Sequence, residues 1–357
     1  MKRWKNLVCV LLAGLLVLSI TACGSSDAEK TPVDNPSTEG AASNNDGVEK
    51  ISWKLAHTCT EDISLHVAAV KMAENIAAAT DGNFVIEVFP NSQLGGNRET
   101  LEGMQFGTIE MNIPNFAYLG GYAPSVSVME LPYLIDDVSS LDGADAVYNS
   151  DVLSQIYGEL EEAGFKWLSG WYMGNRNLTT TNRRVTTPAD MKGLKIRTME
   201  SEWHMAHFNA LGANAVPMAF SEVFTALQQG AIDGQENPYC NIYTMGYHEV
   251  QKYITETAHV FDVVPLLVSK QAYDSLPEEY QQILVDEAKK ITMDEWQWSL
   301  EQNNAYKQKI LDIGTVECIE LSVEERLAFK EAAQSVYDKY AQENGDDLIN
   351  AIANAQK

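Results

Sequence analysis

The stretch "ETLEGMQFGTIE" at residues 99–110 returns in altered form as "EVFTALQQGAID" at residues 222–233. Both copies follow the pattern E-x-x-x-x-(L/M)-Q-x-G-x-I-(D/E). Helix-forming residues fill the first part, glycine is a common C-terminal stop of a helix, and isoleucine then begins an extended segment. One explanation is a chance match of a common helix–glycine–strand unit. The explanation that we favour is two structurally similar lobes, each with its own α/β sheet.

Strand and helix patterns alternate ahead of each copy. Before the first copy, apolar residues alternate over 51–56, recur at helical spacing over 64–79 and alternate again over 84–89. Before the second copy, 194–197 is typical of a short strand and 202–211 of a helix. Strands that alternate with helices are typical of largely parallel sheets with crossover connections. We therefore predict an α/β fold.

Helix-forming residues dominate the C-terminal part of the chain. They run almost without interruption from 277 to 313, and Ser322 with Glu325 fits a capping box that opens another helix. These helices follow both lobes in the sequence. We predict that they brace one lobe against the other.

The N-terminal segment has the pattern of an export signal. Three basic residues precede an uncharged apolar run over 7–20, which is too short for a typical membrane span. The following "ITAC" places small residues ahead of Cys23, as in a lipobox. We predict a lipoprotein signal peptide over 1–22 and lipidation of Cys23 as the mature N-terminus. Ordinary cleavage at a small residue, with Cys23 incidental, is the alternative.

Small and polar residues fill the next segment, "GSSDAEKTPVDNPSTEGAASNNDGV" at 24–48. Such a composition buries too little apolar surface to offset the entropy of ordering the chain. We predict a lipidated flexible tether over 23–50, with a reach of roughly 25–30 Å. That reach would hold a globular body just clear of a membrane. Stable anchoring would need more than one acyl chain.

Composition excludes nucleic acid as a partner. The chain has 50 acidic and 25 basic residues, a formal net charge of −25, and no basic run. Such a surface repels nucleic acid and anionic lipid head groups. The residues after the tether suffice for two modest domains.

Cysteine and histidine patterns predict no metal site. Cys59, Cys240 and Cys318 lie far apart in the body without a C-x-x-C pair, and three cysteines cannot all pair within one chain. We interpret them as small buried hydrophobic residues. His204 and His207 are three positions apart on a predicted helix, but the sequence implies no further ligand for a metal.

Recognisable enzyme motifs are absent from the sequence. G-x-S-x-G, G-x-x-x-x-G-K-[ST], G-x-G-x-x-G and H-E-x-x-H do not occur. The acidic residues form no recognisable catalytic pair, and we interpret most of them as solvated surface. The motifs therefore give no reason to predict an enzyme, and we predict no cofactor.

Two arginines are candidate partners for a carboxylate. Arg197 ends the predicted strand "LKIR", and ligands of open α/β sheets bind beyond the carboxyl ends of strands. Arg176 lies in "GNRNLTT", just after another predicted strand over 168–173. Two guanidinium forks near one cleft suit a planar carboxylate. The alternative is that each arginine pairs with a surface Asp or Glu.

Each copy of the repeat also leads to an asparagine beside a proline. Pro238 holds Asn237 in an extended conformation at the end of a predicted strand, and Pro114-Asn115 occupies nearly the same place in the first copy. We predict that each lobe directs one asparagine toward the space between the lobes.

Five stretches in this order resemble the solute-binding proteins of TRAP transporters, the DctP-like extracytoplasmic receptors for organic acids. They are "SQLGGNRETLEGMQFGTIEM", "LPYL", "TPADMKGLKIR", "GANAVPMAFSEVFTALQQGAIDGQENP" and "HEVQKYIT". The resemblance covers nearly all of residues 51–344. It implies a two-lobed periplasmic-binding-protein-like fold with hinge strands, a long helix that spans both lobes, and a cleft that closes around one ligand.

The resemblance also implies roles for individual residues. Arg197 matches the main carboxylate anchor of the family, and Arg176 matches its second arginine. Asn237 matches an asparagine near the carboxylate, and Phe220 resembles the apolar wall. Further candidates face the ligand from the other lobe or accept its hydroxyl protons: Thr58, Asn97, Asn115, Glu200 and Glu202.

The function implied is capture of a small organic acid, a dicarboxylate or a sugar acid, and its delivery to a membrane permease of small and large subunits. Uptake in this family is typically driven by an ion gradient. We predict lobe I from 51–174 plus about 263–302, and lobe II from 175–262 plus about 303–357. A ligand sensor that serves a signalling receptor is the alternative, and an enzyme acting on sugar acids is a further one.

Overall fold

The computed structural model describes residues 50–357 except 137, 139 and 149, and these residues belong to one compact unit. The predicted signal peptide, Cys23 and the predicted tether up to residue 49 lie outside the described residues. Within the described part, no helix is both long and apolar enough to cross a membrane.

The first half of this unit is a β-α-β-α-β segment with its first strand in the middle. Its elements are β1 (Ile51–Ala56), α1 (Ser64–Ala79), β2 (Phe84–Phe89), α2 (Asn97–Gln105) and β3 (Met111–Asn112). β1 pairs in parallel with β2 on one side and with β3 on the other. The strands and helices predicted for this half are confirmed, although β3 is only two residues long.

The second half repeats this wiring. Its elements are β5 (Lys195–Thr198), α5 (Glu202–Ala210), β6 (Asn214–Pro217), α6 (Val223–Gln228) and β7 (Gly234–Asn237). β5 again lies in the middle and pairs in parallel with β6 and β7. The order of strands and helices along the chain is therefore the same in both halves.

The two copies of the repeated sequence also end their helices in the same way. Gly107 and Gly230 have φ angles of 70° and 69°, in the left-handed region that favours glycine. The residue after each glycine donates its N–H, at 2.9 Å in both copies, to the helix carbonyl five positions earlier. This is the Schellman motif.

The acidic residue at the end of each copy binds an equivalent partner, a backbone N–H on the central strand of its half. Glu110 accepts a hydrogen bond at 2.8 Å from the backbone N–H of Lys54 on β1, and Asp233 accepts one at 2.8 Å from that of Lys195 on β5. Each acid thus ties the start of its strand to the central strand of its half. The two copies of the sequence repeat therefore have equivalent structures in the two halves.

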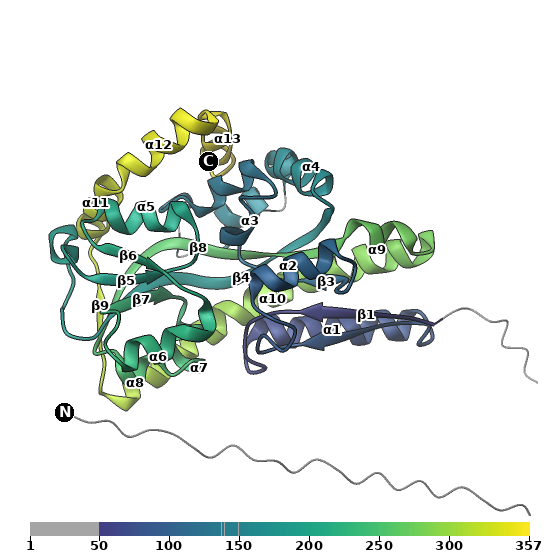
Figure 1. Cartoon of the computed structure of the whole chain (residues 1–357), viewed down its shortest axis with the longest axis horizontal. Helices are drawn as coiled ribbons and strands as arrows, with labels where there is room; N and C mark the ends of the chain where they lie inside the picture. The colour runs from purple at the N-terminus through teal and green to yellow at the C-terminus, as the bar shows by residue number, and fades with distance from the viewer. Residues whose placement is uncertain (1–49, 137, 139, 149) are drawn as a thin grey trace, which may run out of the picture. The chain divides into compact units, whose positions relative to one another are not determined.

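Two long antiparallel strands join the halves. β4 (Phe165–Thr180) and β8 (Tyr253–Ser269) pair along most of their lengths, with bulges, while β3 pairs with β8 and β7 pairs with β4. The strand order is β2-β1-β3-β8-β4-β7-β5-β6, with β9 (Glu317–Glu320) added to β8. The prediction of a separate sheet in each lobe is therefore wrong. One sheet runs through both halves, with β4 and β8 across its middle (Figure 1).

The predicted long helix is α10 (Glu278–Ile313), which contacts α1 from the first half, β4, and α7 (Tyr239–Thr244) from the second. Trp296 on α10 is fully buried and donates its indole N–H to the carbonyl of Gly170 at 2.8 Å. The helix thereby contacts both halves and the strands between them (Figure 1).

Helices after α10 complete the packing. α11 (Val323–Ala332) begins with the predicted capping box, α12 (Gln334–Asn344) packs on α5, and α13 (Asp347–Ala355) packs on α3 (Asp142–Tyr148). Helices that the sequence analysis did not assign include α4 (Ser154–Glu162), α8 (Tyr247–Val250), α9 (Lys270–Ser275) and the 3-10 turns Phe116–Tyr118, Pro124–Glu130, Asp151–Leu153 and Phe220–Glu222. A further 3-10 turn, Pro188–Met191, begins after the cap residue Thr187.

A buried carboxyl lies between α10 and the sheet. Glu295 is fully buried and accepts hydrogen bonds from the Tyr172 N–H at 2.8 Å and from the Ser64 hydroxyl at 3.1 Å. Burial raises its pKa from 4.5 to about 8, although these two donors oppose the shift. The native state therefore keeps a proton that the unfolded chain releases above about pH 4.5.

Glu295→Gln is expected to remove a pH dependence of stability. Because the native state binds the extra proton, the contribution of Glu295 to wild-type stability falls as pH rises from 4.5 toward 8, by at most about 1.4 kcal/mol per pH unit. Urea unfolding of both proteins at pH 6 and pH 8 measures the effect. The other titrating groups are common to both proteins, so a constant difference between them at the two pH values would contradict the assignment.

Candidate functional site

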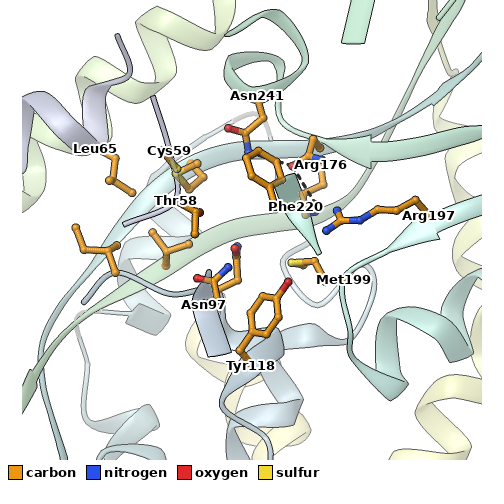
Figure 2. Close-up of a pocket in the computed structure, with 15 residues that line it drawn as sticks. Thr58, Cys59, Leu65, Asn97, Tyr118, Arg176, Arg197, Met199, Phe220 and Asn241 are labelled. Carbon is orange, nitrogen blue, oxygen red and sulfur yellow. Dashed lines mark hydrogen bonds between the residues drawn. The ribbon is translucent and has the colours of Figure 1, made fainter. Parts of the chain in front are cut away.

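Two pairs of parallel strands, β1 with β3 and β5 with β7, have their carboxyl ends at one cavity, whose lining residues Figure 2 shows. Open α/β sheets bind their ligands at this edge. Both halves, α7 and the two long strands contribute to its wall. The residues that line it are Thr58, Cys59, Leu65, Asn97, Ile113, Asn115, Tyr118, Met173, Arg176, Arg197, Met199, Phe220, Asn237, Asn241 and Val264.

Arg197, on β5, has a donor left for a ligand. Its Nε and Nη2 both donate to the carbonyl of Met218, at 3.0 and 2.8 Å. Its Nη1 is buried and has no hydrogen-bond partner among the described residues. Figure 2 shows the guanidinium directed into the cavity. Because a buried donor without a partner is costly, this geometry favours an acceptor in the cavity.

Among the described residues, no carboxylate forms a hydrogen bond or an ion pair with Arg197. Burial lowers the pKa of the guanidinium, and the nearby phenols of Tyr118 and Tyr247 oppose that shift. Arginine remains charged in proteins, so the cavity holds a buried cation that an anion would neutralise. The alternative that Arg197 pairs with a surface acid is wrong.

Arg176, on β4, is instead bound by two buried acids. Its Nε and Nη2 donate to the Glu236 carboxylate at 2.5 and 2.8 Å, and its Nη1 donates to Asp262 at 2.6 Å. Nη2 also donates to the side-chain amide oxygen of Asn237 at 3.2 Å. Burial would lower the pKa of Arg176, but Glu236 and Asp262 raise it well above its usual value. The guanidinium lines the cavity with most of its donors already engaged.

Two histidines extend this ion network beyond Glu236, away from Arg176. His259 contacts the Glu236 carboxylate at 3.0 Å through Nε2 and the Thr257 hydroxyl at 2.8 Å through Nδ1. Burial would raise the pKa of Glu236, but Arg176 and His259 hold it well below its usual value. His207 stacks on His259 with ring centroids 5.2 Å apart. This network fixes the direction of the Arg176 side chain.

His204 and His207 are packing residues of the network. Both are buried on α5, and burial lowers the pKa of His204 to about 3 and that of His207 well below its usual value. The described residues contain no group of three or more His, Cys, Asp or Glu side chains suited to a metal ion.

Three asparagines add amide groups to the wall. Asn237, at the end of β7, accepts the Asn241 amide N–H at 3.0 Å and donates to Gln235 at 2.5 Å. Asn115 donates its amide N–H to Asp262 at 3.4 Å. Asn115 and Asn237 thus line one cavity from the two halves, as the sequence predicts for their positions. Asn241, on α7, follows Asn237 by four residues. This spacing, which equals about one helical turn, is the sequence signal that could have identified Asn241 as a cavity residue.

The sequence repeat also accounts for two further residues of the cavity wall. Asn97, at the start of α2, and Phe220, just before α6, each stand two residues ahead of a copy of the repeat, and both line the cavity. Thr58 lies beyond the end of β1 on the same wall (Figure 2). Tyr118, beside Asn97, carried no signal in the sequence because it lies on a short 3-10 turn outside both copies of the repeat.

The structure places Glu200 in an adjoining hollow rather than in the cavity wall. There its carboxylate lies 3.4 Å from Nε of Arg98, and its carbonyl accepts from Nη2 of Arg98 at 3.2 Å. The hollow shares Thr58, Asn97 and other residues with the cavity. Glu202 lies elsewhere and pairs with Lys339 at 2.9 Å.

Comparison with known sequences identifies the family. Residues 55–344 match the DctP family model, described as bacterial extracellular solute-binding protein, family 7. The C4-dicarboxylate-binding periplasmic protein DctP of Rhodobacter capsulatus is 34% identical over 85% of this chain and 90% of that protein. The 2,3-diketo-L-gulonate-binding periplasmic protein YiaO of Escherichia coli is 31% identical over 85% of this chain and 92% of that protein.

Solved structures agree with this result. A TRAP periplasmic solute-binding protein of Shewanella oneidensis with bound succinate superposes with a TM-score of 0.82 at 30% identity, over 86% of this chain and all of that one. One of Sulfitobacter sp. NAS-14.1 with bound β-D-galacturonate gives 0.81 at 27% identity, over 85% and 99%. These relatives are two-lobed receptors for solutes and not enzymes. This chain therefore belongs to the DctP family of TRAP-type extracellular solute-binding proteins.

Proposed function

We propose that this protein captures a small organic acid, a dicarboxylate or a sugar acid, by a contact between a ligand carboxylate and Arg197. The observation that carries the proposal is the buried Nη1 of Arg197, which has no partner among the described residues and lines the cavity. Relatives supply the ligand class, because their names and bound molecules include dicarboxylates and sugar acids. Asn237, Phe220, Thr58, Asn97 and Asn115 complete the contact surface.

The mechanism is capture by closure of two lobes. We take the lobes to be 51–174 plus about 263–302, and 175–262 plus about 303–357; with these bounds the chain passes between them in β4, β8 and α10. A ligand that contacts both lobes only in the closed state shifts the population toward closure. The closed receptor then docks on a membrane permease of small and large subunits, which takes up the acid.

Anchoring at the membrane is part of the same proposal. Lipidated Cys23 and the tether after it would hold the receptor on the extracytoplasmic side, near the permease. Mass spectrometry of the protein isolated from its native membrane tests this. A diacylated Cys23 at the N-terminus supports the anchor, and an unmodified N-terminus elsewhere contradicts it.

A thermal-shift screen of carboxylic acids is expected to find a stabilising ligand. An acid at 100 times its dissociation constant adds about 2.7 kcal/mol to the free energy of unfolding, which is readily seen as a rise in Tm. Dicarboxylates, uronates, aldonates and keto acids form the set. The methyl ester of each hit is the control, because it keeps the shape and loses the charge. Equal stabilisation by acid and ester would contradict a carboxylate contact.

A further inference from the structure

The ionic groups around the cavity leave one cation without an acidic partner. Arg176 and Arg197 are the charged side chains among the lining residues. Arg176 is already paired with Glu236 and Asp262, all three of them buried. The two arginines and the two acids together carry two positive and two negative charges when all are ionised. Both negative charges lie beside Arg176, so Arg197 is the cation that remains to anchor one ligand carboxylate.

The rest of the wall is neutral. Beyond the end of β1 and along α1 it presents Thr58, Cys59 and Leu65, and Ile113 and Val264 add apolar surface (Figure 2). The adjoining hollow contains Arg98, but this guanidinium is engaged with Glu200 and lies over the Tyr118 ring, 5.9 Å from its centroid. A second carboxylate in the cavity would therefore lose water without meeting a free cation.

The neutral polar groups suit hydroxyl donors better than a second anion. Asn115 and Asn241 each use one of their two amide N–H donors inside the protein, on Asp262 and on Asn237. Their carbonyl oxygens accept no bond from the described residues, and an amide oxygen is an acceptor only. An acceptor attracts an O–H group and repels a carboxylate oxygen. These oxygens therefore favour a ligand whose other end carries hydroxyls.

We propose that the site takes a hydroxylated monocarboxylate, the class that includes uronates and aldonates, and discriminates against dicarboxylates. This inference rests on the proposed capture of an organic acid by Arg197 and narrows its ligand. The carboxylate pairs with the Nη1 of Arg197, and hydroxyls of the ligand donate to the asparagine oxygens. A dicarboxylate would place its second charge against the neutral wall.

Matched pairs of acids test the inference directly. Galacturonate and galactarate differ at one carbon, which is an aldehyde or hemiacetal in the first and a carboxylate in the second. 4-Hydroxybutyrate and succinate differ in the same sense, with a hydroxymethyl group in place of one carboxylate. Calorimetry at pH 7 is expected to show at least tenfold tighter binding of the monocarboxylate in the pair that binds. Tighter binding of the dicarboxylate overturns the inference and leaves the proposed function intact.

Failure of the proposed function has a different signature. If none of the acids in the wider thermal-shift set binds, carboxylate capture itself is wrong. If acids bind and Arg197→Ala leaves their affinities unchanged, the anchor is wrong, and the inference about the second charge falls with it.

A change of wall charge provides a second test. Thr58 is half-buried and lines both the cavity and the adjoining hollow, which leaves room for a longer side chain. Thr58→Lys is expected to raise the affinity for the dicarboxylate relative to its matched monocarboxylate by about tenfold. Thr58→Met is the control of similar length without charge, and it should leave that ratio near its wild-type value. Equal ratios in the two variants would show that the wall charge does not set selectivity and would overturn the inference.

Discussion

Arg197→Ala is expected to weaken binding of the captured acid by about 30-fold to several thousand-fold. Truncating one partner of a desolvated, hydrogen-bonded charge pair costs about 2–5 kcal/mol, and each 1.4 kcal/mol is a factor of ten. Much of this cost arises because the ligand carboxylate would enter a cavity whose free cation is gone. Calorimetric titration with the best acid from the screen measures the loss.

Two variants sharpen the interpretation of that loss. Arg197→Lys keeps the charge but not the planar fork, so we expect an affinity between those of wild type and Arg197→Ala. Arg184→Ala is the matched control, because this half-exposed arginine pairs with Glu317 at 2.7 Å and lies outside the cavity wall. Equal losses in Arg184→Ala and Arg197→Ala would show a general effect of net charge instead of an anchor.

Local signals made much of the fold predictable. The glycine stops and the capping box at Ser322 act within a few residues of one another, so the sequence shows them directly. The repeat then predicted two halves with the same wiring, because equal local geometry after equal strands leads to equal packing. Arg197 and Asn237 were predictable for the same reason, since each lies at the end of a short predicted strand.

Features that depend on distant pairing were not predictable. β4 and β8 join the two halves into one sheet, but their partners are remote in sequence and β4 is interrupted by bulges. Its glycines at 170 and 174 hide the alternation expected of a strand. The predicted strand over 168–173 was therefore only part of β4. The same limit applies to Leu65 and Tyr118, which reach the cavity through tertiary packing.

The partners of Arg176 illustrate this limit most clearly. The sequence analysis allowed a ligand carboxylate or a surface acid for this residue. The structure shows buried Glu236 and Asp262, from β7 and β8. No spacing pattern links three strands that meet only in the folded sheet. The two arginines consequently have different main tasks: Arg197 offers a free donor, and Arg176 holds the strands together.

Arg176→Met is therefore expected to destabilise the fold by about 3–5 kcal/mol at pH 7, because it leaves two buried acids without their cation. Urea unfolding measures this change. Arg197→Met is the matched control: its guanidinium has no bound acid, so its loss is expected to cost much less stability while it removes binding. Similar destabilisation by both substitutions would contradict this division of roles.

The pH dependence of the Arg176→Met effect follows from the same ion network. In wild type the pKa of Glu236 is held below 4.5, so its contribution to stability is present above about pH 4.5 and is lost as pH falls through the lower native value. Without Arg176, burial dominates and the native variant takes up protons on Glu236 and Asp262 at higher pH than the unfolded chain does. The variant thus gains stability relative to wild type as pH falls from 7 toward 5. We expect the difference in unfolding free energy to be largest near pH 7 and to shrink by pH 5; a difference that grows on acidification would show that Arg176 does not stabilise these carboxylates.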